Sequence, residues 1–136
     1  MIEVCCAIIL KESKILAVQR GPESSHPWKW EFPGGKINAG ETAEQSIIRE
    51  IEEELTIRIE ILNQLVPVEF DYGSKQIHLI PFVCEISSGE IKLTEHIATQ
   101  WLEFEELAST DWSDADGELI LKNQESLKLL FPENTL

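Results

Sequence analysis

The chain has few cysteines, and their arrangement excludes two kinds of small protein. Three cysteines occur in 136 residues, at Cys5, Cys6 and Cys84. An odd number with two adjacent members does not form a disulfide framework, and no Cys-x-x-Cys or Cys/His spacing indicates a zinc site. We therefore expect reduced cysteines that pack as small hydrophobes in a strand.

Basic residues are also scarce. Eleven lysines and arginines face 25 aspartates and glutamates, giving a net charge of −14. Such a surface repels polymeric nucleic acid and anionic membranes, so we expect neither as a partner. A small anion is not excluded, because metal ions held by clustered carboxylates reverse the local sign of the charge.

Long apolar runs are absent. The first ten residues, MIEVCCAIIL, are too short an apolar run to cross a membrane and carry no basic leader, so we expect a cytoplasmic protein. The length suits one domain over residues 1–136. The hydrophobic fraction of 43% is that of a globular domain with a core.

Hydrophobic patterns predict an α/β chain with a mixed sheet. Strands are expected at residues 2–10, 15–18, 30–32, 57–68, 76–86, 91–93 and 100–104. Pro33, Gly34 and Gly35 are expected to end the third strand. Helices are expected from Thr42 and over residues 118–131. This order predicts a mixed sheet packed between helices.

The first helix has a clear start and a clear buried face. Thr42 and Gln45 form a capping box, a hydroxyl followed three residues later by a glutamine. Ile47, Ile48, Ile51 and Leu55 then recur at helical spacing and predict a stripe that faces the core.

Three glutamates share one face of this helix, beside the apolar stripe. Glu53 and Glu54 lie at about −60° and +40° from Glu50 on a helical wheel. Like charges at this spacing destabilise a helix by a few tenths of a kcal/mol each. Their oxygens are ligands that Mg²⁺ or Mn²⁺ prefers. By spacing alone, however, a solvated acidic helix face is the simpler interpretation.

The stretch GKINAGETAEQSIIREIEEELTI, residues 35–57, resembles the signature box of the Nudix hydrolase superfamily. The fixed positions of that box are filled here by Gly35, Glu41, Arg49, Glu50, Ile51, Glu53, Glu54 and Ile57. Thr56 replaces the last glycine, which usually ends a helix in the left-handed conformation. A β-branched residue in that conformation costs about 1–2 kcal/mol, so we expect strain there or a different helix end.

The similarity continues outside the box and points to the MutT-like triphosphate pyrophosphohydrolases. It covers the segments Gln19-Arg20, WEFPGGK at residues 30–36, KQIHL at 75–79, TEHIATQWLEFEEL at 94–107 and WSDADGELI at 112–120. The pairs Glu95-His96 and Ala115-Asp116 are similar to the small bacterial CTP pyrophosphohydrolase branch.

The resemblance implies a Nudix α/β/α sandwich and a Mg²⁺-dependent enzyme, with Mn²⁺ as an alternative. It implies hydrolysis of a nucleoside triphosphate, a small-molecule nucleotide substrate, to a monophosphate and pyrophosphate. The implied metal-binding residues are the Gly34 carbonyl, Glu50, Glu53, Glu54 and Glu95. The implied substrate-binding residues are Arg20, Gly35, Lys36, Lys75 and Asp116. Either Glu50 or Glu95 would act as the base, and Arg49 would hold the glutamates.

Several alternatives stay open. Members of the superfamily also cleave ADP-ribose and other nucleoside diphosphate derivatives, and some modules with this fold only bind. An acidic protein that binds Ca²⁺ or a basic partner would not explain the spacing of Gly35, Glu41 and Arg49. Asp116 is compatible with a cytosine or with an oxidised purine. Both a monomer and a homodimer are possible.

Overall fold

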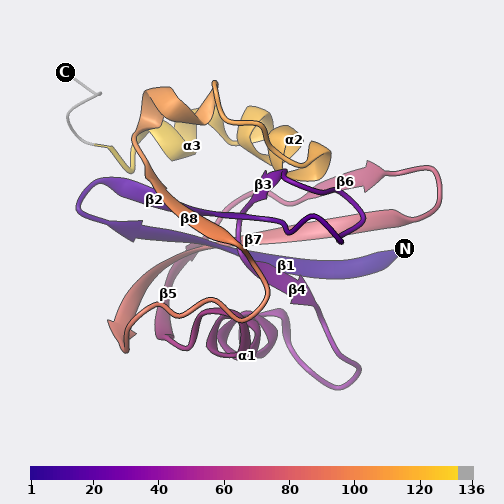
Figure 1. The fold of residues 1–136 in the computed structure, drawn as a ribbon, viewed down its shortest axis with the longest axis horizontal. Coiled ribbons are helices and arrows are strands. Elements are labelled where there is room, and N and C mark those ends of the chain that lie inside the picture. The colour runs from indigo at the N-terminus through magenta and orange to yellow at the C-terminus, as the bar shows by residue number, and fades with distance from the viewer. Residues whose placement is uncertain (132–136) are drawn as a thin grey trace.

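The computed structural model describes residues 1–131 and consists of a mixed sheet with helices on both faces (Figure 1). The path through the sheet is β3-β2-β1-β7-β5, with β4 paired to β1, β6 to β7 and β8 to β2. The strands are β1 (Ile2–Lys11), β2 (Lys14–Gln19), β3 (Trp30–Glu31), β4 (Gly34–Lys36), β5 (Arg58–Gln64), β6 (Val68–Asp71), β7 (Gln76–Ser88) and β8 (Ala98–Leu102).

Strand β1 lies at the centre of the sheet and serves both layers. It pairs in parallel with β7, and its side chains alternate between the two faces. Cys6 and Ile8 belong to the core beneath the C-terminal helices, whereas Cys5, Ala7 and Ile9 belong to the core beneath α1. Because both faces are covered, the strand is apolar almost throughout.

Helix α1 (Ala43–Leu55) packs on one face of the sheet, and its predicted start and stripe are confirmed. Thr42 is the N-cap, and both hydrogen bonds of the capping box with Gln45 are present. Of the stripe, Ile47, Ile51 and Leu55 are fully buried, and Ile48 is partly buried against the same core. Thr56 does adopt the left-handed conformation, with φ 60° and ψ 27°, so the strain expected there is present.

The other face is covered by α2 (Asp114–Lys122) and α3 (Gln124–Lys128), with the 3-10 helix η1 (Phe104–Leu107) before them. The single helix predicted over 118–131 is therefore wrong in two respects. It begins earlier, at Asp114, and it is interrupted at Asn123, whose side chain bonds the backbone of Val66 and Leu119. With helices on both faces, the predicted sandwich is confirmed.

Three strand predictions need correction. Residues 57–68 form two strands, because the chain leaves the ladder at residues 65–67 and β6 pairs with β7 separately. Residues 91–93 form no strand. Gly34–Lys36, expected to end a strand, form β4 and pair with Val4–Cys6 of β1.

The remaining fold predictions concern cysteines and membranes. All three cysteines are free and buried, as expected. Burial raises the pKa of the Cys5, Cys6 and Cys84 thiols, so they remain protonated packing residues. Among the helices of residues 1–131, none has the length and apolar character needed to span a membrane.

Candidate active site

The three glutamates of α1 lie at different depths. The Glu53 side chain is 61% exposed, that of Glu50 is 16% exposed, and that of Glu54 is 4% exposed. This gradient follows from their place beside the apolar stripe, with Glu54 nearest the core. The glutamates thus form an acidic edge between solvent and the sheet.

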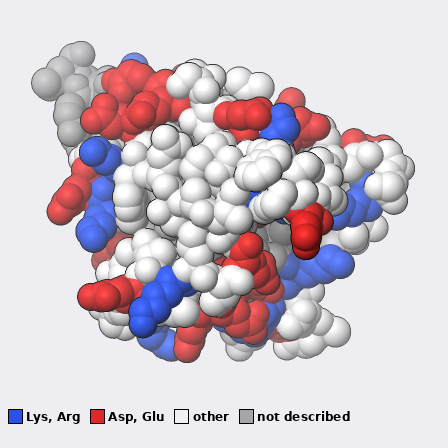
Figure 2. Space-filling model, viewed as in Figure 1, with Lys and Arg blue, Asp and Glu red and all other residues white. Residues whose placement is uncertain are grey.

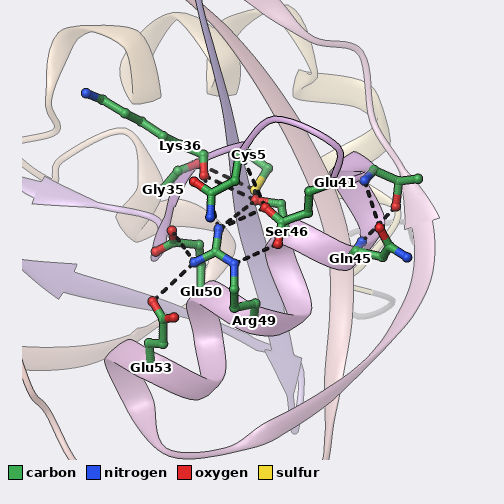
Figure 3. A network of polar contacts seen from close by, with 11 residues as sticks. Cys5, Gly35, Lys36, Glu41, Gln45, Ser46, Arg49, Glu50 and Glu53 are labelled. Carbon is green, nitrogen blue, oxygen red and sulfur yellow. Dashed lines mark hydrogen bonds and ion pairs between the residues drawn. The ribbon is translucent and has the colours of Figure 1, made fainter.

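Arg49 ties this edge to the loop before the helix (Figure 3). Its Nε and Nη2 donate to the two carboxylate oxygens of Glu41 at 2.7 and 2.9 Å. Its Nη1 donates to Glu50 at 2.9 Å and to Glu53 at 3.2 Å. The Arg49 hydrogen bonds, with one from the Asn38 backbone, lower the pKa of Glu41 to about 2. The contacts expected of Arg49 are therefore present.

Two glycines bring β4 close to its neighbours. A Cβ on Gly34 would overlap the backbone of Cys5 and Cys6 in β1. A Cβ on Gly35 would overlap the carboxylate of Glu50. The Gly-Gly pair therefore lets the backbone of β4 approach β1 on one side and the Glu50 carboxylate of the acidic edge on the other.

Glu54 is the most perturbed carboxyl at this edge. Burial, together with the negative charges of Glu95, Glu50 and Glu31, raises its pKa to about 9. Its Oε2 atom is buried and has no hydrogen-bond partner within the described chain. Converging hard oxygens and an unpaired buried acceptor suit a divalent cation. In residues 1–131, however, no three Asp, Glu, His or Cys side chains are already arranged as a coordination sphere.

A pocket of about 200 Å³ opens beside β4, between β1, β7, α2 and the loop over residues 21–29. All six residues that were predicted to lie at the substrate, or to offer a backbone oxygen to metal, line it: Arg20, Gly34, Gly35, Lys36, Lys75 and Asp116. Glu95, in contrast, lies outside the pocket in an exposed position before β8. The structure thus brings together residues that are up to 96 positions apart in sequence.

Asp116 lies in the wall of this pocket. Its Oδ2 accepts a hydrogen bond of 2.8 Å from the Phe32 backbone N–H. Burial and the negative charge of Glu31 raise the pKa of Asp116 well above its usual value. A neutral carboxyl at this position can donate one hydrogen bond and accept another.

Arg20 reaches the pocket from the end of β2. Its Nη1 donates to Glu31 at 2.9 Å and its Nη2 donates to Ser25 at 3.2 Å. Lys75 is exposed and occupies the turn before β7, where its carbonyl accepts from the Tyr72 N–H. Tyr72 also stacks on His26 of the loop, with ring centroids 4.9 Å apart.

Sequence reasoning missed Glu31 and His96 as site residues. Glu31 accepts from Arg20 and lies 2.8 Å from Nε2 of His96. Burial opposes ionisation of Glu31, but His96 and Arg20 together hold its pKa below the usual value. Both stand in segments that carried the resemblance, Glu31 in WEFPGGK and His96 in TEHIATQWLEFEEL, and that was the available signal.

Comparisons with known proteins agree with this geometry. A family model described as NUDIX domain matches residues 1–122. This chain belongs to the Nudix family. The CTP pyrophosphohydrolase of Escherichia coli K12 is 33% identical over 120 residues, covering 88% of this chain and 89% of the relative. The 8-oxo-dGTP diphosphatase of the same organism is 30% identical over 122 residues, with coverages of 89% and 95%.

The fold comparison gives the same result. The crystal structure of the MutT protein from Methanosarcina mazei Go1 superposes with a TM-score of 0.83 at 25% identity, covering 93% of this chain and 95% of that one. The predicted recognition and fold are therefore confirmed. The protein is a Nudix hydrolase, an enzyme of the pyrophosphohydrolase class.

Proposed function

We propose that this Nudix hydrolase cleaves a nucleoside triphosphate to a nucleoside monophosphate and pyrophosphate with the help of Mg²⁺. The observation that carries the proposal is the pocket beside β4. It combines a buried carboxyl, Asp116, with the cationic groups of Arg20, Lys36 and Lys75, and Gly35 joins it to the acidic edge of α1. Such a site suits a ligand with a base at one end and phosphates at the other.

The base is proposed from the hydrogen-bonding capacity of Asp116. Cytosine offers an acceptor at N3 beside an amino donor at N4. A neutral carboxyl matches this edge, because it donates to one atom and accepts from the other. The same capacity suits an oxidised purine. Two relatives are named for CTP and for 8-oxo-dGTP, and these are the two triphosphate classes we propose, with a role in removing unwanted nucleotides from the pool.

The divalent cation would be held by oxygen ligands at the acidic edge. We assign this role to Glu50, Glu53, Glu54 and Glu95, with the carbonyl of Gly34. Mg²⁺ or Mn²⁺ suits this donor set. When bound, the cation neutralises phosphate charge and lowers the pKa of a coordinated water.

The side chains of the protein provide the other functions that hydrolysis requires: attraction of the substrate, acceptance of a proton and positioning of the metal ligands. Arg20, Lys36 and Lys75 attract the polyphosphate into a protein whose net charge would otherwise repel it. Glu50 or Glu95 accepts the proton of the attacking water. Arg49 is a positioning residue, because its guanidinium holds Glu41, Glu50 and Glu53 at fixed distances.

The test is pyrophosphate release with Mg²⁺ across CTP, dCTP, 5-substituted cytosine triphosphates, dGTP, 8-oxo-dGTP and ADP-ribose. We expect turnover of a cytosine or oxidised purine triphosphate, and a loss of about 100-fold in Glu53→Gln, because a metal ligand is removed while the fold is kept.

Glu52→Gln is the matched control, since Glu52 lies on the same helix but points to Arg58 at 3.8 Å. It should retain turnover. AMP from ADP-ribose without pyrophosphate from any triphosphate would favour the diphosphate alternative. Nucleotide binding without any product would favour a non-catalytic module, and unchanged turnover in Glu53→Gln would reject the metal-site assignment.

A further inference from the structure

A line of four side chains joins the pocket to the acidic edge of α1. Arg20 Nη1 donates to Glu31 Oε1 at 2.9 Å. Glu31 Oε2 lies 2.8 Å from His96 Nε2, and His96 Nδ1 lies 3.8 Å from Glu54 Oε2. The four residues come from the end of β2, from β3, from the segment before β8 and from α1, so the line exists only in the folded chain.

The last link of this line is closed to solvent but not hydrogen-bonded. The side chains of His96 and Glu54 are 6% and 4% exposed. Both atoms that face each other, His96 Nδ1 and Glu54 Oε2, lack a hydrogen-bond partner within residues 1–131. Two buried polar atoms left unpaired and facing one another are uncommon in folded proteins. Each of the two atoms therefore keeps the capacity for one further polar contact.

The middle link, between Glu31 and His96, fixes the imidazole ring. Since Nε2 of His96 bonds to Glu31, the position of the Glu31 carboxylate determines where Nδ1 meets Glu54. Side chains that contact a ligating carboxylate orient it and thereby tune the affinity for the cation. A base entering the pocket would act on Arg20 and Glu31 first, and the ring would carry that change to Glu54.

We infer that His96 is a positioning residue that couples occupancy of the nucleoside pocket to cation binding at Glu54. This inference rests on the proposed function, because Glu54 is a cation ligand only there. It assigns to Glu31 and His96 a role beyond packing: binding of a base and binding of the cation become mutually dependent, as coupled sites must be.

The test measures Mn²⁺ affinity by calorimetry with and without a saturating nucleoside, either cytidine or 8-oxo-2′-deoxyguanosine. A nucleoside carries no phosphate, so it lacks the oxygen ligands through which a nucleotide would bind the cation strongly. We expect the nucleoside to change the Mn²⁺ Kd of the wild type about fivefold or more, within the usual range of coupling between sites.

Two variants interrupt the line at different links. In His96→Gln an amide can replace Nε2 and keep the contact with Glu31, whereas in His96→Asn an amide can replace Nδ1 and keep the contact with Glu54. Each variant should reduce the coupling to a ratio near one. His78→Asn is the matched control, because His78 forms a similar pair with Glu3 at 2.6 Å on β7 and β1, outside this line. It should keep the wild-type ratio.

The outcomes separate the inference from the function on which it rests. Glu31→Gln provides a third interruption if a His96 variant does not fold. A ratio near one in an active wild type, or an unchanged ratio in folded His96 or Glu31 variants, would overturn the inference alone. Absence of triphosphate hydrolysis by the wild type, measured in parallel, would overturn the proposed function.

Discussion

A single carboxyl, Asp116, illustrates how a site residue can weaken the fold that holds it. Burial and the charge of Glu31 raise its pKa in the folded chain, so between its ordinary pKa and the folded one it is protonated in the folded chain but ionised in the unfolded chain. The unfolded state then binds fewer protons, and stability falls as pH rises above about 4 toward the folded pKa. Below about 4, both states are protonated and the penalty vanishes.

Replacing Asp116 by Asn should therefore stabilise the protein at pH 7. The amide oxygen can still accept from the Phe32 N–H, and the ionisation penalty is removed. We expect a gain on the order of 1–3 kcal/mol in the free energy of unfolding at pH 7 and almost none at pH 4. Urea denaturation at the two pH values measures both.

Asp114→Asn is the control, because Asp114 is exposed in the first turn of the same helix. It should lose a few tenths of a kcal/mol at pH 7, because a charge at the helix N-terminus is removed. A loss of stability in Asp116→Asn at pH 7 would show that the folded chain does not raise the pKa of Asp116.

The C-terminal end of helix α1 is strained, and this strain affects the stability of the helix and not the active site. Thr56 holds a left-handed conformation, and its Oγ1 donates to the Glu90 carbonyl at 3.0 Å. Thr56→Gly should raise stability by about 1 kcal/mol, because the relief of backbone strain exceeds the loss of one exposed hydrogen bond. Thermal unfolding should show this as a rise in Tm of about 3–4 °C.

Thr56→Ala separates the two contributions to that change. It removes the hydrogen bond but keeps a Cβ in the left-handed conformation, so it should be less stable than the wild type. If the glycine and alanine variants were equally stable, backbone strain at this position would be negligible.

The elements show where sequence reasoning succeeds and where it stops. Helix α1 was predictable because its cap and its apolar stripe are local patterns in the chain. Strand β4 was not predictable, because glycines such as Gly34 and Gly35 usually indicate the end of a strand. Here they permit the close approach of β4 to β1 and to Glu50. The interruption between β5 and β6 at residues 65–67 and the interruption between α2 and α3 at Asn123 occur together, because the Asn123 side chain forms hydrogen bonds with the backbone of Val66, 57 positions away. Such a long-range contact is not visible in either local pattern.

The candidate site divides in the same way. The box glutamates and Arg49 could be named from the fixed spacing of one motif, whereas Arg20, Lys75 and Asp116 were named from the resemblance of short segments outside it. Glu31 and His96 are 65 positions apart and acquire meaning only when β3 and the segment before β8 meet. Nothing local distinguishes a buried histidine that bridges two carboxyls from one that merely packs.

On the scale of the whole molecule, negative charge lowers the stability of the folded state and at the same time favours the binding of cations. On the face shown in Figure 2, acidic side chains gather along the upper and lower edges, over the helical layers, while the middle is largely uncharged. With a net charge of −14, self-repulsion destabilises the compact state. The acidic edge of α1 has a separate cost, because burial and neighbouring carboxylates raise the pKa of Glu54 to about 9 and so oppose its ionisation.

Mg²⁺ should therefore offset most of the stability advantage that Glu54→Gln has over the wild type. Without the cation, the folded Glu54 is protonated at pH 7 whereas the unfolded one is ionised, so stability declines between about pH 4.5 and 9. Glutamine removes this penalty, and we expect a gain on the order of 1–3 kcal/mol. Millimolar Mg²⁺ should stabilise the wild type by about 2–3 kcal/mol if it exceeds Kd about 100-fold.

The comparison needs thermal unfolding in Mg²⁺ and in NaCl of equal ionic strength. NaCl should raise the Tm of both proteins alike, because it screens the net charge. The additional rise in Mg²⁺ should occur in the wild type and in Glu105→Gln, which removes one exposed charge far from α1 in sequence, but not in Glu54→Gln. An equal Mg²⁺ effect in all three proteins would mean that the cation acts on the overall charge and not at Glu54. Burial of the Glu54 carboxyl would then lower the stability of the protein without contributing to cation binding.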